Sequence, residues 1–251
     1  MRKSTKIIVG LAVVALAGAG ITATCIKGVK SKHLNIPQGF TLTAHTGCEG
    51  TRDNSLEAIR KGAAAGVDIV EFDLNFTDSG EPVLAHDKAE SDSVTLREAF
   101  ETVAEYETLR VNVDCKSTDN LSLVCEIAEE CGILDRIFYS GIEEKDVEAV
   151  KRQTPDIKYY LNKDINKSKK NDEEYIRSLV KLVKDMGAAG LNINFGGASE
   201  KMTEIFHSEG LEVSVWTVNK ELHMHKVLAL GCDNITTREP SMLIDIIESK
   251  K

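Results

Sequence analysis

The sequence predicts an α/β protein with a (β/α)8 fold, the TIM barrel, from two observations. Short apolar segments alternate with longer segments that have the amphipathic pattern of helices, from residue 40 to the C-terminal region. Alternation of this kind produces a parallel sheet, and eight such units suggest that the sheet closes into a barrel. An open sheet with helices on both faces is the structural alternative, and it usually has fewer strands.

The elements follow one another in a regular order. Predicted strands lie at 40–45, 67–73, 110–115, 136–140, 157–161, 190–194, 211–218 and 233–237, and predicted helices lie between them at 55–65, 95–106, 119–131, 142–152, 173–186, 199–209 and 220–230. Glycines mark several boundaries, Gly66, Gly187 and Gly210 among them, as expected where helices end. The run PVLAH (82–86) follows the turn sequence 77–80, so we interpret it as a hairpin-like return and not as a ninth barrel strand.

Residues 1–32 form a separate N-terminal segment, and residues 33–251 form the barrel domain. Residues 7–26 carry no charge, lie between basic flanks, and are numerous enough to span a bilayer as a helix. The segment is therefore interpreted as a membrane anchor or as a long signal peptide. Either interpretation sends the barrel across a membrane. The expected location is the extracytoplasmic side of the cell membrane, or outside the cell if the segment is cleaved.

The barrel domain is acidic. The chain has 31 lysines and arginines and 40 acidic residues, and six of the basic residues lie in the first 32 positions. Residues 33–251 therefore carry 25 basic residues against 40 acids, a formal charge of −15. An overall field of this sign argues against nucleic acid as a partner. An anionic substrate must be bound by local positive charge or by a metal.

The six cysteines contain no C-x-x-C pair, which argues against a zinc ribbon. Cys25 lies in the uncharged N-terminal run, so an odd number remains for the barrel domain. A disulfide framework is not expected in a domain of this size. We interpret most of the cysteines as small buried residues.

Ionisable residues recur where the predicted strands end. Side chains two apart on a strand point to the same face, so Glu71 and Asp73 project together, and two like charges there require a cation between them. Active sites of (β/α)8 barrels form at the C-terminal ends of the strands. The residues at those ends are His45, Glu71, Asp73, His86, Asp114, Lys116 and Trp216.

These residue types indicate a particular chemistry. The carboxylates of Glu71, Asp73 and Asp114 can converge on one hard divalent cation, Mg²⁺ or Ca²⁺. His45 and His86 then remain free to act as base and acid. Lys116 is a positive charge that can face a phosphate oxygen, and together with a metal it would neutralise charge developing on a phosphoryl group.

In this order the motifs resemble the glycerophosphodiester phosphodiesterase family. The resemblance covers about residues 40–240 and rests on His45-x-Gly47, Asp53-Asn54-Ser55, Glu71-x-Asp73, Thr77-Asp78-x-Gly80, His86-Asp87, Asp114-x-Lys116, Trp216-Thr217-Val218-Asn219 and Gly231-x-Asp233. It implies metal-dependent hydrolysis of a glycerophosphodiester to glycerol phosphate and an alcohol through a cyclic phosphate. It implies His45 and His86 as the catalytic pair, and Glu71, Asp73 and the strand-three acid as metal ligands.

Three positions depart from the family pattern. Thr46 stands where an arginine is usual, Asp114 where a glutamate is usual, and Asp53 where a glutamate usually precedes the asparagine. An arginine would bind phosphate through a bidentate fork, which threonine cannot do. Asp at the strand-three position also resembles the related sphingomyelinase D branch. The short span from Asp87 to Asp114 leaves little room for an inserted cap.

Three alternatives therefore stay open. The substrate is a small glycerophosphodiester, or it is a lipid such as a lysophospholipid or sphingomyelin, or the barrel binds phosphodiesters without turning them over. Two further candidate residues also have two interpretations each. Asn54 either contacts the substrate region and orients the site or caps the helix that begins near Ser55. Trp216 either forms the floor of a substrate pocket or fills the mouth of the barrel.

Overall fold

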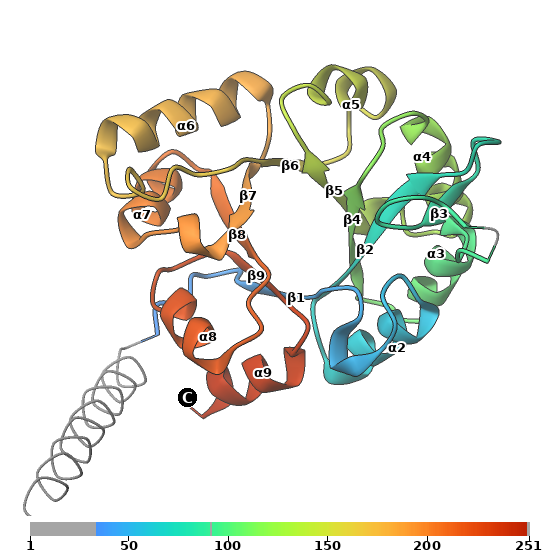
Figure 1. The fold of residues 1–251 in the computed structure, drawn as a ribbon, viewed down its shortest axis with the longest axis horizontal. Coiled ribbons are helices and arrows are strands. Elements are labelled where there is room, and N and C mark those ends of the chain that lie inside the picture. Colours follow the sequence, from blue (N-terminus) through green and yellow to red (C-terminus); the bar gives the residue numbers. More distant parts are fainter. Residues whose placement is uncertain (1–33, 91, 250–251) are drawn as a thin grey trace, which may run out of the picture.

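Eight parallel strands close into a barrel that is surrounded by helices (Figure 1). The structure is a computed structural model that describes residues 34–90 and 92–249. The barrel strands are β1 (Thr41–Ala44), β2 (Ile69–Phe76), β4 (Arg110–Cys115), β5 (Ile137–Ile142), β6 (Tyr159–Asn162), β7 (Gly190–Asn194), β8 (Glu212–Trp216) and β9 (Asn234–Thr237). Pairing of β1 with both β2 and β9 closes the sheet, which confirms the predicted (β/α)8 barrel.

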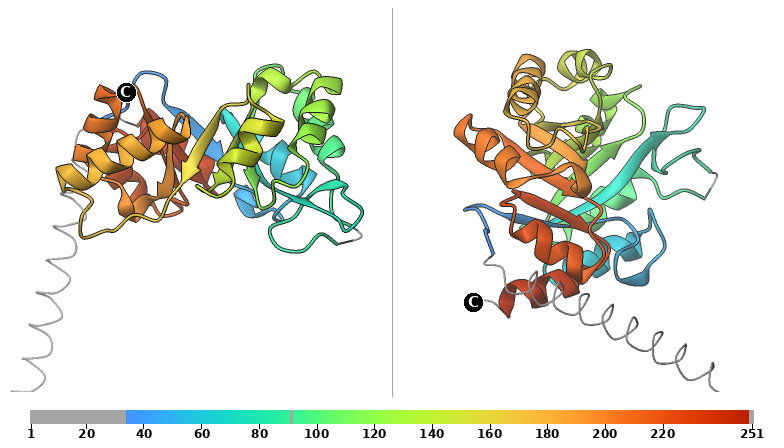
Figure 2. Two further views of the ribbon diagram at one scale, coloured as in Figure 1. Left: turned by 90° about the horizontal axis from the view of Figure 1, so that it is seen from above. Right: turned by 60° about the vertical axis from the view of Figure 1, so that its left-hand side comes forward.

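The return segment also lies where the sequence places it. Strand β3 (Pro82–Leu84) pairs antiparallel with the end of β2, with Leu84 opposite Leu74. It is a hairpin outside the closed ring, and the segment that contains it projects from the rim of the barrel (Figure 2). This hairpin lengthens β2 beyond its neighbours and carries the chain back toward the barrel mouth.

The helices begin and end at residues that suit those positions. They are α2 (Leu56–Ala65), α3 (Leu96–Ala104), α4 (Leu121–Glu130), α5 (Val147–Gln153), α6 (Glu173–Met186), α7 (Glu200–Ser208), α8 (Glu221–Leu228) and α9 (Pro240–Glu248). Helix α3 starts with a capping box between Thr95 and Glu98. Helices α2 and α6 stop at Gly66 and Gly187, whose positive φ angles suit glycine.

Short 3₁₀ turns at Cys48–Gly50, Leu134–Arg136 and Phe195–Gly197 complete the connections. Helix α9 is the one helix of this set that the sequence analysis did not predict. Its signal is present in the sequence, because Pro240 occupies the first helical turn and Leu243 and Ile246 are buried three residues apart.

The strands have two unlike faces. On β4, Val111 and Val113 are fully buried in the apolar layer between barrel and helices. Asn112 and Asp114 alternate with them and line a cavity inside the barrel. Apolar packing outside the barrel thus leaves its interior free for polar groups.

The predicted N-terminal anchor or signal segment lies outside the described residues. Across 34–90 and 92–249, the structure contains no helix with the length and apolar character needed to span a bilayer. The described cysteines are Cys48, Cys115, Cys125, Cys131 and Cys232, and all of them are free, three of them buried. This agrees with the expectation that they are packing residues rather than a disulfide framework.

Candidate active site

A cavity of about 340 Å³ opens inside the barrel at the C-terminal ends of the strands. Its size lies within the range of about 300–1,000 Å³ that is usual for small-molecule sites. Its lining is strongly polar: His45, Asp53, Glu71, Asp73, His86, Asn112, Asp114, Lys116, Ser140, Asn162, Asn192, Trp216, Thr217, Thr236 and Arg238. All the site residues expected from the sequence line this cavity except Asn54.

The three expected metal ligands come together. Glu71, Asp73 and Asp114 each offer an oxygen, and these oxygens all lie within 4.8 Å of one another. The β2–β4 register produces this cluster, because it sets Asp73 directly beside Asp114. Burial, with the added negative charges of Asp73 and Asp114, raises the pKa of Glu71 well above its usual value. A cation at this position would relieve that electrostatic strain.

The donor set fits a hard divalent cation. All three side chains present oxygen, and the Oδ1 atom of Asn112, on the wall of the same cavity, is buried without a hydrogen-bond partner among the described residues. Mg²⁺ and Ca²⁺ take carboxylate and amide oxygens in preference to softer donors. The shorter Asp114 does not prevent convergence, since the Ser140 hydroxyl holds its Oδ1 at 2.9 Å.

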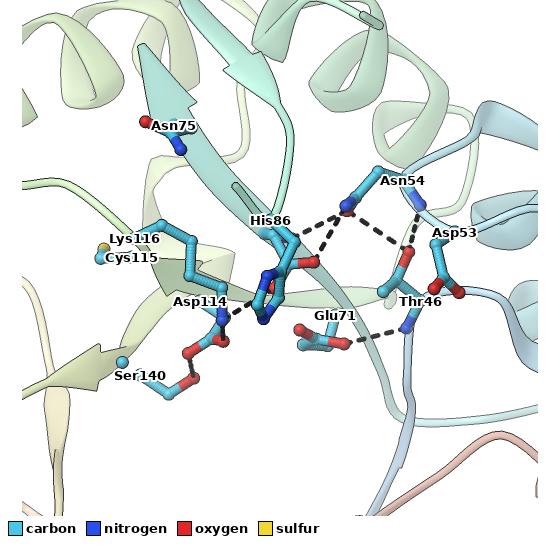
Figure 3. Close-up of polar contacts among 12 residues, drawn as sticks. Thr46, Asp53, Asn54, Glu71, Asn75, His86, Asp114, Cys115, Lys116 and Ser140 are labelled. Carbon is cyan, nitrogen blue, oxygen red and sulfur yellow. Dashed lines mark hydrogen bonds and ion pairs between the residues drawn. The ribbon is translucent and has the colours of Figure 1, made fainter. Parts of the chain in front are cut away.

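Lys116 contacts two of the three acids, Asp73 and Asp114, and Figure 3 shows it beside Asp114. Its Nζ lies 3.0 Å from Asp73 Oδ1 and also forms an ion pair with Asp114. Burial opposes its charge, but the Asp114 and Asp73 carboxylates outweigh this and raise the pKa of Lys116 above its usual value. Lys116 is therefore positively charged and offsets part of the negative charge of the three carboxylates.

The ring of His45 is held in one orientation by the backbone. Its Nδ1 lies 2.8 Å from the carbonyl oxygen of Thr46, and because a carbonyl only accepts, Nδ1 must carry the proton. The neutral ring therefore has its free lone pair on Nε2. Burial lowers the pKa of His45, and the charge of Arg238 adds to this against the opposing hydrogen bond to Thr46. A neutral imidazole is the form that can accept a proton.

His86 reaches the cavity from the hairpin return. The N–H of Ala85 donates to the carbonyl oxygen of Asp73 at 3.0 Å, which fixes the chain beside this residue of β2. The next residue, His86, has a largely exposed ring whose Nδ1 lies 2.9 Å from Asp87 Oδ1. The two histidines thus enter the site from different segments, one following β1 and the other following β3.

Asn54 lies behind the three carboxylates and not in the cavity lining. Its Nδ2 donates to Asp73 Oδ2 at 2.9 Å, and its Oδ1 accepts from the Asp73 N–H at 3.0 Å. Asn54 therefore orients the carboxylate of Asp73. The cap of α2 is the neighbouring Ser55, whose hydroxyl accepts from the N–H of Ala58.

Thr46, which occupies the position of the expected arginine, is buried and faces away from the cavity. Its N–H donates to Glu71 Oε2 at 2.9 Å, and its hydroxyl accepts from the Asn54 N–H at 2.5 Å. Position 46 therefore supports the acids from behind and presents no group to a substrate.

Trp216 forms part of the cavity wall at the end of β8. Its indole Nε1 is buried without a partner in the described part of the chain.

Several residues that line the cavity were not predicted from the sequence. Asn162 and Asn192 line the cavity, and Asn192 Nδ2 donates to Asn162 Oδ1 at 3.1 Å. Ser214, which does not line the cavity, donates to Asn192 Oδ1 at 2.9 Å. On the rim, Arg238 Nη2 lies 2.9 Å from Asp53 Oδ2. The signal for Arg238 was available, since it directly follows the last strand and so stands at an end where active-site groups gather.

Comparison with known proteins agrees with this geometry. The sequence profile of the Glycerophosphoryl diester phosphodiesterase family matches residues 44–112 and 116–242. A glycerophosphodiester phosphodiesterase from Caldanaerobacter subterraneus subsp. tengcongensis is 23% identical over 236 residues, which cover 82% of this chain and 97% of that protein.

Solved structures show the same fold. An Oleispira antarctica phosphodiesterase in complex with the product sn-glycerol-3-phosphate has a TM-score of 0.70 at 18% identity, covering 85% of this chain and 97% of that one. A Thermotoga maritima glycerophosphodiester phosphodiesterase has a TM-score of 0.66 at 19% identity, covering 86% and 100%. With the family profile matched across most of the barrel, the chain belongs to the glycerophosphoryl diester phosphodiesterase family, whose members are phosphoric diester hydrolases.

Proposed function

We propose that this protein hydrolyses glycerophosphodiesters to glycerol phosphate and an alcohol with the help of a divalent cation, Mg²⁺ or Ca²⁺. The observation that carries the proposal is the convergence of three carboxylates, a lysine and two histidines in one cavity. A bound cation would polarise the phosphoryl oxygens and offset the charge that develops on them.

The protein's own groups account for the proton transfers. In the first step, Nε2 of His45 accepts the proton of the glycerol hydroxyl next to the phosphodiester. The freed oxygen attacks phosphorus, which closes a cyclic phosphate, and the bond to the leaving alcohol breaks. His86, in its protonated form, donates a proton to the departing oxygen. The attacking hydroxyl is already part of the substrate, so proximity replaces an encounter between two molecules.

The second step reverses the proton flow. His86, now neutral, takes a proton from water, and the water oxygen attacks phosphorus. The ring bond from phosphorus to the glycerol oxygen that attacked in the first step breaks, and His45 returns its proton to that oxygen. Glycerol phosphate is released and both histidines regain their starting forms. Lys116 stays charged throughout, beside the two carboxylates that it contacts.

The decisive test is product release from glycerophosphocholine, followed by enzymatic detection of glycerol phosphate. We expect turnover with Mg²⁺ or Ca²⁺, loss of turnover with a chelator, and a reduction of about 10²–10⁴-fold in His45→Ala and His86→Ala. His223→Ala is the matched control, because His223 lies on α8 outside this cavity. Full turnover in a chelator-stripped sample would contradict the metal mechanism.

A lipid phosphodiester is the second candidate substrate. Between β3 and β4 the described chain forms only α3 and its connections, so no inserted domain covers this side of the mouth. An uncovered mouth can admit a bulky headgroup or a lipid tail. Parallel turnover assays with glycerophosphocholine and a lysophospholipid separate the two, and binding of both without turnover across several metals would favour an inactive barrel.

We also propose that residues 1–32 attach the barrel to the extracytoplasmic face of the cell membrane, or direct its secretion if the segment is cleaved. Support comes from the uncharged run 7–26 and its basic flanks. Fractionation of cells that produce the full chain or residues 33–251 alone is the test. We expect the full chain with membranes or, if cleaved, in the medium. Equal cytoplasmic recovery of both would contradict this proposal.

A further inference from the structure

We infer that Arg238 supplies the guanidinium that binds the non-bridging oxygens of the substrate phosphate, the role that Thr46 cannot fill. This inference rests on the proposed phosphodiesterase function and adds to it a residue that contacts the substrate.

Barrel closure brings Arg238 beside His45. Strands β1 and β9 are parallel neighbours in which Ala44 is opposite Thr237, so the next residues, His45 and Arg238, leave the two strands at the same level. The His45 N–H donates to the carbonyl oxygen of Thr237 at 2.8 Å, which extends this register to the histidine. Arg238 therefore reaches the position next to the catalytic base from the adjacent strand.

The backbone of Arg238 is held on both sides. Its N–H donates to Asn219 Oδ1 at 2.8 Å, and its carbonyl oxygen accepts from the N–H of Glu49 at 2.9 Å. Movement is thus confined to the side chain. This also gives Asn219, at the end of the Trp216–Asn219 motif, a function: it fixes the segment that presents the arginine.

The guanidinium of Arg238 lies close to Gly47, on the side where a side chain at this position would project. A Cβ at position 47 would come within 1.9 Å of Asp53 Oδ1 and 3.3 Å of Arg238 Nη1. The Asp53–Arg238 pair therefore occupies the space that a side chain at position 47 would fill. Since Gly47 also has a φ of 71°, both its backbone and its missing side chain suit this arrangement.

Most of the hydrogen-bonding capacity of Arg238 is free for a ligand. The side-chain partner recorded for it within residues 34–90 and 92–249 is Asp53, through Nη2. Five N–H groups are available on a guanidinium, in a fork that matches two phosphate oxygens. The side chain is 39% exposed and lines the cavity, so a phosphate can reach it.

Of the described positively charged side chains in the cavity, Arg238 is the one that can bind a phosphate. Lys116 and Arg238 are the only lysine or arginine among the described residues that line it. Lys116 is already bound to two carboxylates of the metal cluster. Asp53 is half exposed and stands apart from that cluster, so its pair with Arg238 is a resting contact that a phosphate can replace.

The test compares Arg238→Gln and Arg238→Lys with the wild-type protein, and uses Arg97→Gln as the matched control. Arg97 also pairs with an acid at the surface, Glu130, but lies on α3 away from the cavity. We expect Arg238→Gln to lower kcat/KM by about 10- to 100-fold, as for loss of charge-assisted hydrogen bonds. Arg238→Lys should recover part of the loss, because it keeps the charge but not the fork.

A second measurement separates phosphate binding from a structural role. Calorimetric titration with glycerol 3-phosphate should show weaker binding in Arg238→Gln by a similar factor, with an unchanged Tm and unchanged affinity for Mg²⁺ or Ca²⁺. Added guanidinium ion at millimolar concentration should restore part of the activity of Arg238→Ala but none of that of His45→Ala.

The inference is overturned if Arg238→Gln behaves like Arg97→Gln in both assays, or if its defect is in metal affinity or Tm and not in glycerol 3-phosphate affinity. If the wild-type protein turns over no phosphodiester, the proposed function fails. The glycerol 3-phosphate titration then still decides whether Arg238 binds phosphate.

Discussion

Replacing Glu71 with glutamine should change the stability of this protein in opposite directions with and without metal. Glu71 is 6% exposed, and its carboxylate lies among those of Asp73 and Asp114. Burial and these charges raise its pKa, so without a cation its negative charge destabilises the fold. Glutamine has the same shape, and its oxygen can still accept the hydrogen bond from the Thr46 N–H.

The size of the effect follows from the neutralisation of one buried charge. Replacing buried ionic groups with neutral ones of similar volume stabilises proteins by about 1–4 kcal/mol. We expect about 1–2 kcal/mol here, because Lys116 already offsets part of the negative charge of the cluster. Glu71→Gln should therefore raise the free energy of unfolding of the metal-free protein at neutral pH.

The pH dependence has a definite sign. Since the folded-state pKa of Glu71 is raised, the folded protein binds a proton that the unfolded chain has released. Stability of the metal-free wild type should therefore fall as the pH rises from the usual glutamate pKa through the raised one. The difference between Glu71→Gln and wild type should be small at low pH and grow toward neutral pH.

Chemical denaturation in a chelator and in excess Mg²⁺ or Ca²⁺ measures these effects. A cation at 100 times its dissociation constant should stabilise the wild type by about 2.7 kcal/mol, and Glu71→Gln should lose most of that gain. Glu129→Gln, an exposed change on α4, is the control and should alter neither value. A Glu71→Gln protein that is less stable than wild type in chelator, or that metal stabilises equally, would refute the electrostatic reasoning.

Two further predictions concern the residues around the cluster. Asn54→Ala should weaken divalent-cation binding by about 10–100-fold, because it removes both hydrogen bonds that fix Asp73; calorimetric titration measures it, and unchanged affinity would contradict that role. Gly47→Ala should lower the free energy of unfolding by about 2–3 kcal/mol, through its positive φ and the displacement of Asp53. Gly39 has a φ of 84° and no atom within 4 Å of an added Cβ, so Gly39→Ala should lose only the part that comes from backbone strain, about 1 kcal/mol. Equal losses of unfolding free energy in the two variants would contradict the packing argument.

Local sequence was sufficient to predict most strands and helices and about half of the site residues. Most barrel strands are short segments rich in apolar residues, and most helices carry an amphipathic period, so both could be predicted from neighbouring residues. The spacing of Glu71 and Asp73 put two carboxylates on one face of a strand for the same reason. Helix α9 was missed although Pro240 marks its start, because no further strand follows it to complete the alternation.

Only the tertiary structure decided which distant groups meet. The β2–β4 register set Asp114 beside Asp73, and packing turned Thr46 inward to support Glu71. Closure of the barrel joined its first and last strands and so placed Arg238 next to His45. Strand periodicity fixes the face on which a side chain lies, but the partner across the sheet depends on register and closure, which are set by contacts over the whole chain.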